Sequence, residues 1–116
     1  MIDSNELVLS INESVNQLNN YGVLASVFTN GEIQLKNEVA IDFYDYFQKI
    51  IDESIDRTSS MLISTFFNEE NVKLRVEMED VREINFNGLI KDFYEVQQQY
   101  EDNTLTVTIT LKKEVD

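Results

Sequence analysis

Strict alternation of apolar and polar residues marks two stretches of the sequence, 72–79 and 104–111. Because a β-strand points successive side chains to opposite sides, a period of two predicts strands with one face in the core and the other in water. The apolar positions are Val72, Leu74, Val76 and Met78 in the first stretch and Leu105, Val107, Ile109 and Leu111 in the second. A sheet that is apolar on one side needs a cover on that side, which predicts a layer of helices.

Two further segments are expected to belong to this sheet. Residues 61–67 are mostly apolar and are joined to 72–79 by the polar residues 68–71, which predicts a hairpin. Residues 94–100 either continue a helix that begins near Phe86 or form a strand that pairs across the turn Asp102-Asn103. We favour the strand because Tyr94, Val96, Gln98 and Tyr100 share a parity and would lie on one face of it.

Two amphipathic segments are expected to supply the helices. Asp3 or Ser4 can cap the first, and Gly22 can end it in a left-handed conformation. Its apolar residues recur at helical spacing, as Leu7, Ile11, Val15 and Leu18. The second helix is expected after the capping residue Asn37 and to about Arg57, with an apolar stripe that includes Val39, Phe43, Phe47 and Ile50 and with Asp42 outside it.

The segment between the two helices is short and β-branched. Residues 23–28 are expected to form a strand. Asn30-Gly31 is typical of a tight turn with two positive φ angles, so we expect a hairpin with a brief return strand at residues 33–35.

The composition excludes several classes of function. The 116 residues contain no His, Cys, Trp or Pro, which excludes a Ser-His-Asp triad, ordinary zinc, haem and iron–sulfur sites, disulfides and a phosphohistidine on this chain. Only three glycines are present, and they are scattered, so no Walker-type loop or dinucleotide-binding motif exists.

The net charge and the apolar runs bear on partners and location. A charge of −13 makes nucleic acid and anionic membranes unfavourable partners. Because no apolar run approaches the ~20 residues of a membrane span and the N-terminus lacks the basic region of a signal peptide, we expect a cytoplasmic location without membrane contact. No linker or repeat interrupts residues 1–116, which predicts a single domain.

The expected order of helices and strands resembles the catalytic domain of bacterial sensor histidine kinases, in the GHKL ATPase superfamily. A long helix in that family carries the motif apolar-apolar-x-Glu-Ala-Leu-x-Asn. Residues 50–57 here, Ile-Ile-Asp-Glu-Ser-Ile-Asp-Arg, have the same shape. The resemblance implies a catalytic role for Glu53. Arg57 stands where the family has an Asn that binds magnesium, and a guanidinium cannot coordinate a metal.

Two later motifs of the family concern the nucleotide. The family's Asp-x-Gly-x-Gly corresponds to residues 80–84, which keep Asp80 without either glycine, and Gly-x-Gly-Leu corresponds to 86–89, which keep Gly88. The resemblance implies that Asp80 recognises adenine and that Gly88 approaches the nucleotide. The stretch between Asp80 and Gly88 is too short for the lid that the family places there.

What the resemblance implies is a two-layer α/β sandwich, with a mainly antiparallel sheet covered on one face by helices. It also implies ATP and Mg as cofactors, and as partners a histidine-bearing dimerisation domain and a response regulator. The changes at Arg57 and at the glycines predict that Mg-ATP binding is degenerate. The alternatives are a pseudo-ATPase that docks a response regulator or another signalling partner, and an acidic interaction domain that merely shares the order of elements.

Simpler interpretations exist for the same residues. Glu53 and Arg57 are four apart and can form an exposed ion pair on a helix, and Asp80 can belong to a solvated turn that closes a strand. Phe66 and Phe67 are adjacent in a strand and must face opposite sides, so one of them can mark a surface for a partner.

Overall fold

The computed structural model describes residues 1–86, 88, 91 and 93–112. In chain order its elements are β1 (Ile2–Asp3), α1 (Ser4–Tyr21), β2 (Leu24–Asn30), β3 (Gln34–Leu35), α2 (Asn37–Ser54), β4 (Ser60–Phe67), β5 (Val72–Glu79), β6 (Tyr94–Glu101) and β7 (Thr104–Leu111).

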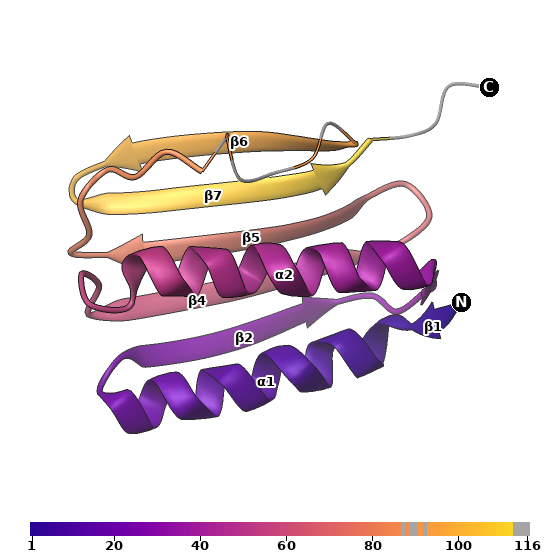
Figure 1. The fold of residues 1–116 in the computed structure, drawn as a ribbon, viewed down its shortest axis with the longest axis horizontal. Coiled ribbons are helices and arrows are strands. Elements are labelled where there is room, and N and C mark those ends of the chain that lie inside the picture. The colour runs from indigo at the N-terminus through magenta and orange to yellow at the C-terminus, as the bar shows by residue number, and fades with distance from the viewer. Residues whose placement is uncertain (87, 89–90, 92, 113–116) are drawn as a thin grey trace.

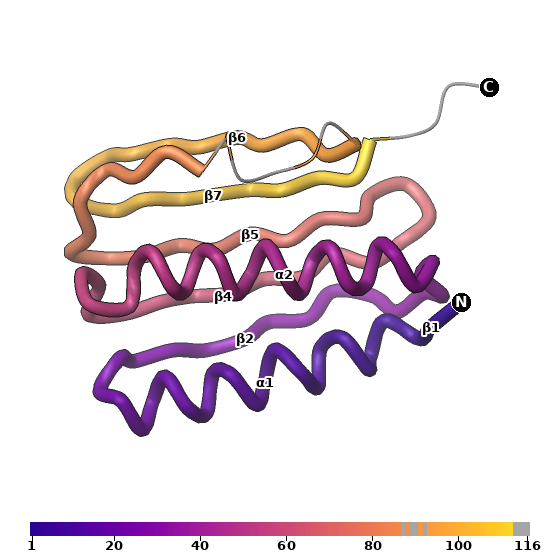
Figure 2. Tube along the Cα trace, viewed as in Figure 1, coloured from indigo at the N-terminus to yellow at the C-terminus, as the bar shows by residue number. Residues whose placement is uncertain are grey.

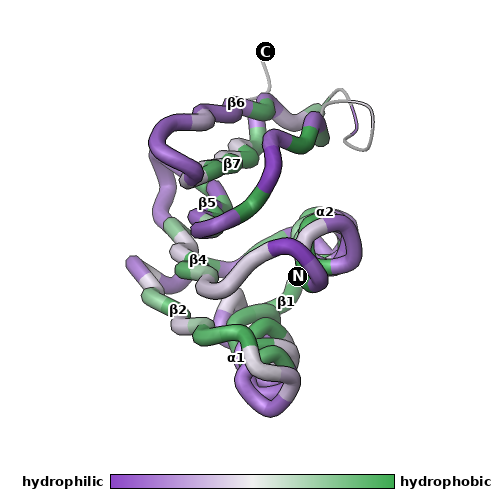
Figure 3. The backbone as a smooth tube through the Cα atoms, turned by 90° about the vertical axis from the view of Figure 1, so that its left-hand side faces the viewer, coloured by the Kyte–Doolittle hydropathy of each residue, from purple (hydrophilic) through white to green (hydrophobic). Residues whose placement is uncertain are grey.

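Five strands form one sheet in the order β2-β4-β5-β7-β6. The strands pair in antiparallel fashion except β2, which runs parallel to β4. Both helices lie on the same face of this sheet (Figures 1 and 3). The two-layer α/β sandwich predicted from the sequence is therefore confirmed.

Helix α1 begins and ends as predicted. The Asp3 carboxylate accepts a 2.9 Å hydrogen bond from the backbone N–H of Asn5, as an N-cap does. Gly22 follows the helix with φ of 102°, in the left-handed region, and its N–H reaches the last carbonyls of the helix.

Helix α2 differs from the prediction at both ends. Lys36 is the N-cap residue and makes no capping hydrogen bond with its side chain, so Asn37 is the first helical residue rather than the cap. At the other end the helix stops at Ser54, and Arg57 lies in the turn that follows. The backbone N–H groups of Arg57 and Thr58 both donate to the Ser54 carbonyl. Because the bond from Arg57 spans three residues, the chain turns more tightly here than in an α-helix.

The predicted hairpin across Asn30-Gly31 is wrong. β3 pairs with β1, and β2 instead pairs with β4. Gly31 has φ of 86°, but Asn30 does not share a positive φ. A Cβ at Gly31 would come within 2.3 Å of the Phe67 carbonyl oxygen, so this glycine permits a close approach to β4 rather than a two-residue turn.

Two antiparallel hairpins form the rest of the sheet, as predicted (Figure 2). β4 and β5 are joined through residues 68–71, and β6 and β7 through Asp102 and Asn103, whose φ angles are 52° and 63°. Residues 94–101 are thus a strand. The short helix expected near Phe86 falls partly on residues 87, 89, 90 and 92, which lie outside the described residues.

The core lies between the sheet and the helices, where the predicted inward positions are buried. Val76 of β5, for example, pairs with Ile63 of β4 and Val107 of β7, and all three side chains are inaccessible to solvent. Phe43 and Phe47 of α2 pack into the same core.

Candidate functional site

The residues that resemble nucleotide-binding motifs belong to three places in the fold: the end of α2, the end of β5, and the segment between β5 and β6. α2 and β5 end at the same end of the molecule (Figure 1, left). The fold therefore brings the end of α2 and the end of β5 to the same end of the molecule.

Asp80 follows β5 and has a left-handed backbone, with φ of 58°. Its backbone N–H donates a 3.0 Å hydrogen bond to the Asn103 carbonyl in the β6–β7 turn. Its carboxylate accepts a 2.6 Å hydrogen bond from the Ser59 hydroxyl, just before β4. These bonds fit the simpler interpretation of Asp80 as the residue that closes a turn, since they tie together the ends of three strands.

Glu53 and Gly88 are both exposed. No ion pair between Glu53 and Arg57 occurs among the described residues, and Arg57 lies beyond the end of the helix, so the predicted i, i+4 pair is absent there. A Cβ at Gly88 would meet nothing within 4 Å, so this glycine is not required by a close contact with the described protein atoms. No described hydrogen bond or ion pair joins Glu53, Asp80 and Gly88 to one another.

The stretch 81–86 covers the helix-side face of the last hairpin. Val81 and Phe86 are buried in the core. The Gln98 side chain of β6 accepts a 2.7 Å hydrogen bond from the Phe86 N–H and donates one to the Ile84 carbonyl. The Tyr100 hydroxyl donates a 3.1 Å bond to the Val81 carbonyl. This stretch is therefore fixed to β6 as part of the core.

A polar cluster surrounds the buried carboxylate of Asp42 in α2. Lys91 Nζ lies 2.7 Å from Asp42 Oδ1, and the Tyr94 hydroxyl donates a 2.8 Å bond to Oδ2. The Tyr46 hydroxyl accepts a 3.2 Å bond from the Lys91 backbone N–H. Asp42 is only 9% exposed, which corrects the sequence interpretation that placed it outside the buried stripe.

This cluster shifts the titration of its members. The hydrogen bond to Asp42 raises the pKa of Lys91 above its ordinary value. Burial, and then the bond to Asp42, raises the pKa of Tyr94, and burial raises that of Tyr46. A signal for the cluster was present in the sequence, since Val39, Asp42, Phe43 and Tyr46 have the i, i+3, i+4, i+7 spacing of one helix face.

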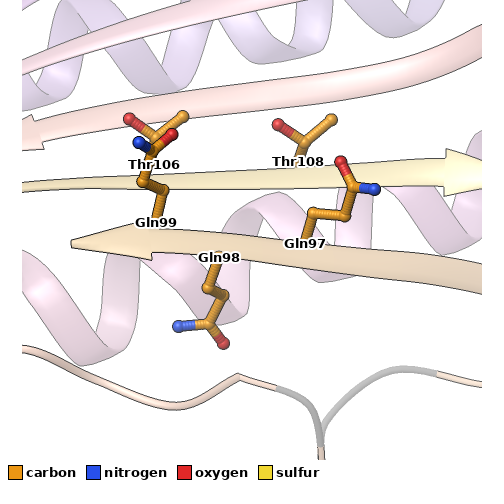
Figure 4. A pocket seen from close by; sticks show the side chains of 5 residues that line it. All are labelled: Gln97, Gln98, Gln99, Thr106 and Thr108. Carbon is orange, nitrogen blue, oxygen red and sulfur yellow. The ribbon is translucent and has the colours of Figure 1, made fainter.

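Two hollows on the surface have linings that include none of Glu53, Asp80 and Gly88. One lies along β6 and β7 and is lined by neutral polar side chains, Gln97, Gln98, Gln99, Thr106 and Thr108. Figure 4 shows Gln97 and Gln99 on one side of β6 and Gln98 on the other. The second hollow lies near the N-terminus, where its lining includes Asp3, Glu6, Asn37 and Ile41. Among the described residues that line these hollows, none has a basic side chain that could hold a phosphate.

Few of the groups that hold Mg-ATP in proteins are present among the described candidate residues. A triphosphate is held in proteins by a metal, by backbone N–H groups of glycine-rich turns or by basic side chains. Arg57 cannot bind a metal, and Lys91 is already paired with Asp42. The described residues contain no cluster of three or more acidic side chains able to hold a metal ion. Asp80, the residue expected at adenine, is engaged with Ser59.

Sequence comparisons identify no relative. The sequence matches no protein-family model, and no curated protein sequence matches it. In the described part of the chain, neither helix has the length and apolarity that a membrane crossing requires.

Solved structures, in contrast, are similar over almost the whole chain. The histidine kinase AdeS of Acinetobacter baumannii superposes with a TM-score of 0.70 at 12% identity, over 95% of this chain and 64% of that chain. The nucleotide-free catalytic domain of histidine kinase ThkA gives 0.59 at 9% identity, over 92% and 88%. ThkA in complex with the response regulator TrrA gives 0.60 at 9% identity, over 92% and 38%.

The chain thus spans less than two thirds of the AdeS chain and nearly the full length of the isolated ThkA catalytic domain. At these identities the likeness concerns the fold. The protein has the α/β fold of the catalytic domains of histidine kinases.

Proposed function

We propose that residues 1–116 form a single cytoplasmic domain of the histidine-kinase type that does not bind Mg-ATP and that acts as a protein-interaction module in two-component signalling. The observation that carries the proposal is the state of the segment after β5. Its residues 81–86 are fixed to β6, and the Lys91 side chain is fixed to α2. Residues of the segment to which the resemblance assigns nucleotide binding are therefore engaged in hydrogen bonds within the protein, which supports the proposal.

Electrostatics supports the same proposal. ATP carries several negative charges, and this chain has 22 acidic against 9 basic residues. Without a metal ligand at Arg57 and without paired glycines, little offsets the repulsion between the nucleotide and the protein. Glu53 is then a surface residue of α2, and Asp80 stabilises the turn at the end of β5.

The partner in this proposal is a protein of the same signalling system. Either a histidine-bearing dimerisation domain or a response regulator would fit. The complex of ThkA with TrrA supports the second, because ThkA has the same fold and binds a response regulator.

Isothermal titration calorimetry with a non-hydrolysable Mg-ATP analogue tests the loss of nucleotide binding. We expect no saturable heat with the wild-type domain. The informative variant is Asp80→Asn, because Asn tolerates the positive φ and removes only the charge. The matched control is Glu70→Asn, an exposed acidic residue in the β4–β5 turn.

Saturable micromolar binding that disappears in Asp80→Asn but persists in Glu70→Asn would overturn the proposal. The domain would then be an ATP-binding kinase domain with divergent motifs. Circular dichroism of each variant shows whether a loss of binding reflects a loss of fold.

A further inference from the structure

Strand β2 is an edge of the sheet, and its outer side differs from the other edge. β2 pairs only with β4, and its sequence, Leu24–Asn30, contains no charged residue. The opposite edge strand, β6, contains Glu95 and Glu101, and residues 81–86 cover its helix-side face through Gln98 and Tyr100. Because charges and covering segments keep strand edges from pairing with other chains, β2 is the less protected edge.

The first half of the β2 edge is closed by one side chain. The Asn19 amide of α1 accepts a 2.8 Å hydrogen bond from the Ala25 N–H and donates a 3.2 Å bond to the Ala25 carbonyl. Asn19 thus satisfies Ala25 as a neighbouring strand would. The bonds also show that the Ala25 backbone groups point away from β4.

The second half of the edge is open. Strand geometry repeats every two residues, so the backbone groups of Val27 and Thr29 point the same way as those of Ala25. Within the described part of the chain, no hydrogen bond from another element reaches these groups. Thr29 and Asn30 are exposed, and Val27 is half-buried.

Apolar side chains adjoin this open edge on the uncovered face of the sheet. Phe28 is 62% exposed and Leu24 is 73% exposed. Phe66 of β4 is half-buried on the same face, while Phe67 points into the core, so Phe66 is the member of the pair that faces outward. We call the backbone of Val27–Thr29 together with the side chains of Leu24 and Phe28 the β2 edge surface.

The surroundings of this surface are acidic. Glu32 follows β2, and Glu69 and Glu70 lie in the β4–β5 turn, which Gly31 approaches through the Phe67 carbonyl. The cations Lys73 and Arg75 lie over the ring of Phe66, but they belong to β5, which β4 separates from β2. A second copy of this chain would bring another charge of −13, whereas a basic chain would be attracted.

We propose that the β2 edge surface docks an extended, basic segment of a partner protein, which adds a strand through the backbone groups of Val27 and Thr29 and packs an apolar side chain beside Phe28. Strand addition of this kind obtains affinity from main-chain hydrogen bonds and specificity from alternate side chains. The inference names a surface for the interaction role and in that sense rests on the proposed function.

The test uses a synthetic peptide in which lysine alternates with valine and threonine, titrated into the isotopically labelled protein and followed by NMR. We expect saturable shifts centred on the amides of Val27 and Thr29. Thr29→Pro removes an outward donor, and Phe28→Lys removes the apolar contact and adds a like charge. Each is expected to weaken binding about tenfold, the equivalent of one or two lost hydrogen bonds.

Asn19→Ala is expected to act in the opposite direction. It frees the Ala25 backbone groups, lengthens the available edge and should tighten binding of the same peptide. The control is Gln97→Lys, which adds the same charge to the opposite edge strand and should leave the affinity unchanged. If Thr29→Pro does not fold, the comparison of the peptide affinities of Phe28→Lys and Gln97→Lys still tests the proposal.

Three results would overturn the proposal. The first is a lack of chemical shift changes at β2, and the second is equal binding of a peptide with glutamate in place of lysine. The third is a dimer in sedimentation equilibrium that Thr29→Pro dissociates, because the occupant of the edge would then be a second copy of this chain. Nucleotide calorimetry is independent of this edge, so the loss of one proposal is distinguishable from the loss of the other.

Discussion

The hydroxyl of Tyr94 in β6 donates a 2.8 Å hydrogen bond to the carboxylate of Asp42 in α2, 52 positions earlier in the chain. The ring of Tyr94 also packs edge to face on Phe43 and Tyr46, at centroid distances of 5.3 and 5.0 Å. Since Lys91 binds the other carboxylate oxygen, the buried charge of Asp42 is compensated on both sides. This arrangement fixes how the last hairpin and the segment before it lie on α2.

Removal of the Tyr94 hydroxyl should destabilise the fold. Tyr94→Phe keeps the ring but deprives a buried carboxylate of a donor, so we expect a loss of about 1–3 kcal/mol in the free energy of unfolding, measured by urea denaturation. The control is Tyr21→Phe, which removes an exposed hydroxyl 3.4 Å from Asp56 and should change stability by less than about 0.5 kcal/mol. Equal effects would contradict a special role for the Asp42 cluster.

Stability should fall at alkaline pH. The pKa values of Tyr94 and Tyr46 are raised in the folded state by burial, and that of Lys91 is raised by Asp42. An unfolded chain loses its tyrosine protons near the ordinary pKa of about 10, before the folded chain does. The stabilisation is therefore complete below that pH and is lost as the pH rises towards the folded-state pKa values. Melting temperatures across pH 7 to about 11 measure this, and Tyr94→Phe should flatten the decline.

The three glycines should respond to alanine in a graded order. Gly31→Ala combines a positive φ with a clash against the Phe67 carbonyl and should be the most harmful, with a cost above about 2 kcal/mol. Gly22→Ala has the positive φ without a clash and should cost about 1–2 kcal/mol. Gly88→Ala has neither and should be nearly neutral. Chemical denaturation of the three variants checks the order, and a large effect at Gly88 would show a packing role that its surroundings do not suggest.

The two faces of β7 should differ sharply under the same substitution. Val107→Lys places a charge in the solvent-inaccessible core and should unfold the protein. Thr106 lies on the open face beside its cross-strand partner Glu77, so the positive charge of Thr106→Lys should be tolerated. Circular dichroism and thermal melting distinguish the two outcomes. A folded Val107→Lys variant would mean that the strand faces are wrongly assigned.

Local patterns predicted the two hairpins and the limits of α1. The alternation in β5 and β7 and the capping by Asp3 and Gly22 each depend on neighbours in sequence, which explains this success. The partner of β2 could not be predicted in the same way. Asn30-Gly31 carries a strong hairpin signal, but contact with β4, distant in the sequence, determines the conformation of Gly31.

The candidate site was predicted less completely. Glu53, Asp80 and Gly88 came from a resemblance, and their roles toward a nucleotide stay predictions. The hydrogen bonds of Asp80 with Ser59 and Asn103 could not be predicted from the sequence, because they depend on the meeting of three strand ends. The helical spacing of Asp42 indicates its position, but the charge of a carboxylate favours a water-facing position unless partners such as Lys91 and Tyr94 are known.

The single parallel pairing in the sheet also bears on how the chain folds. The β4–β5 and β6–β7 hairpins join neighbouring segments, whereas β3 and the whole of α2 lie between β2 and β4 in the chain. Loop closure over long separations slows folding, so we expect β2 and α1 to add last to a sheet that already exists. Until they do, the side of β4 that binds β2 is itself an open edge. The order of assembly, and not only the final structure, then determines which chains this domain can pair with.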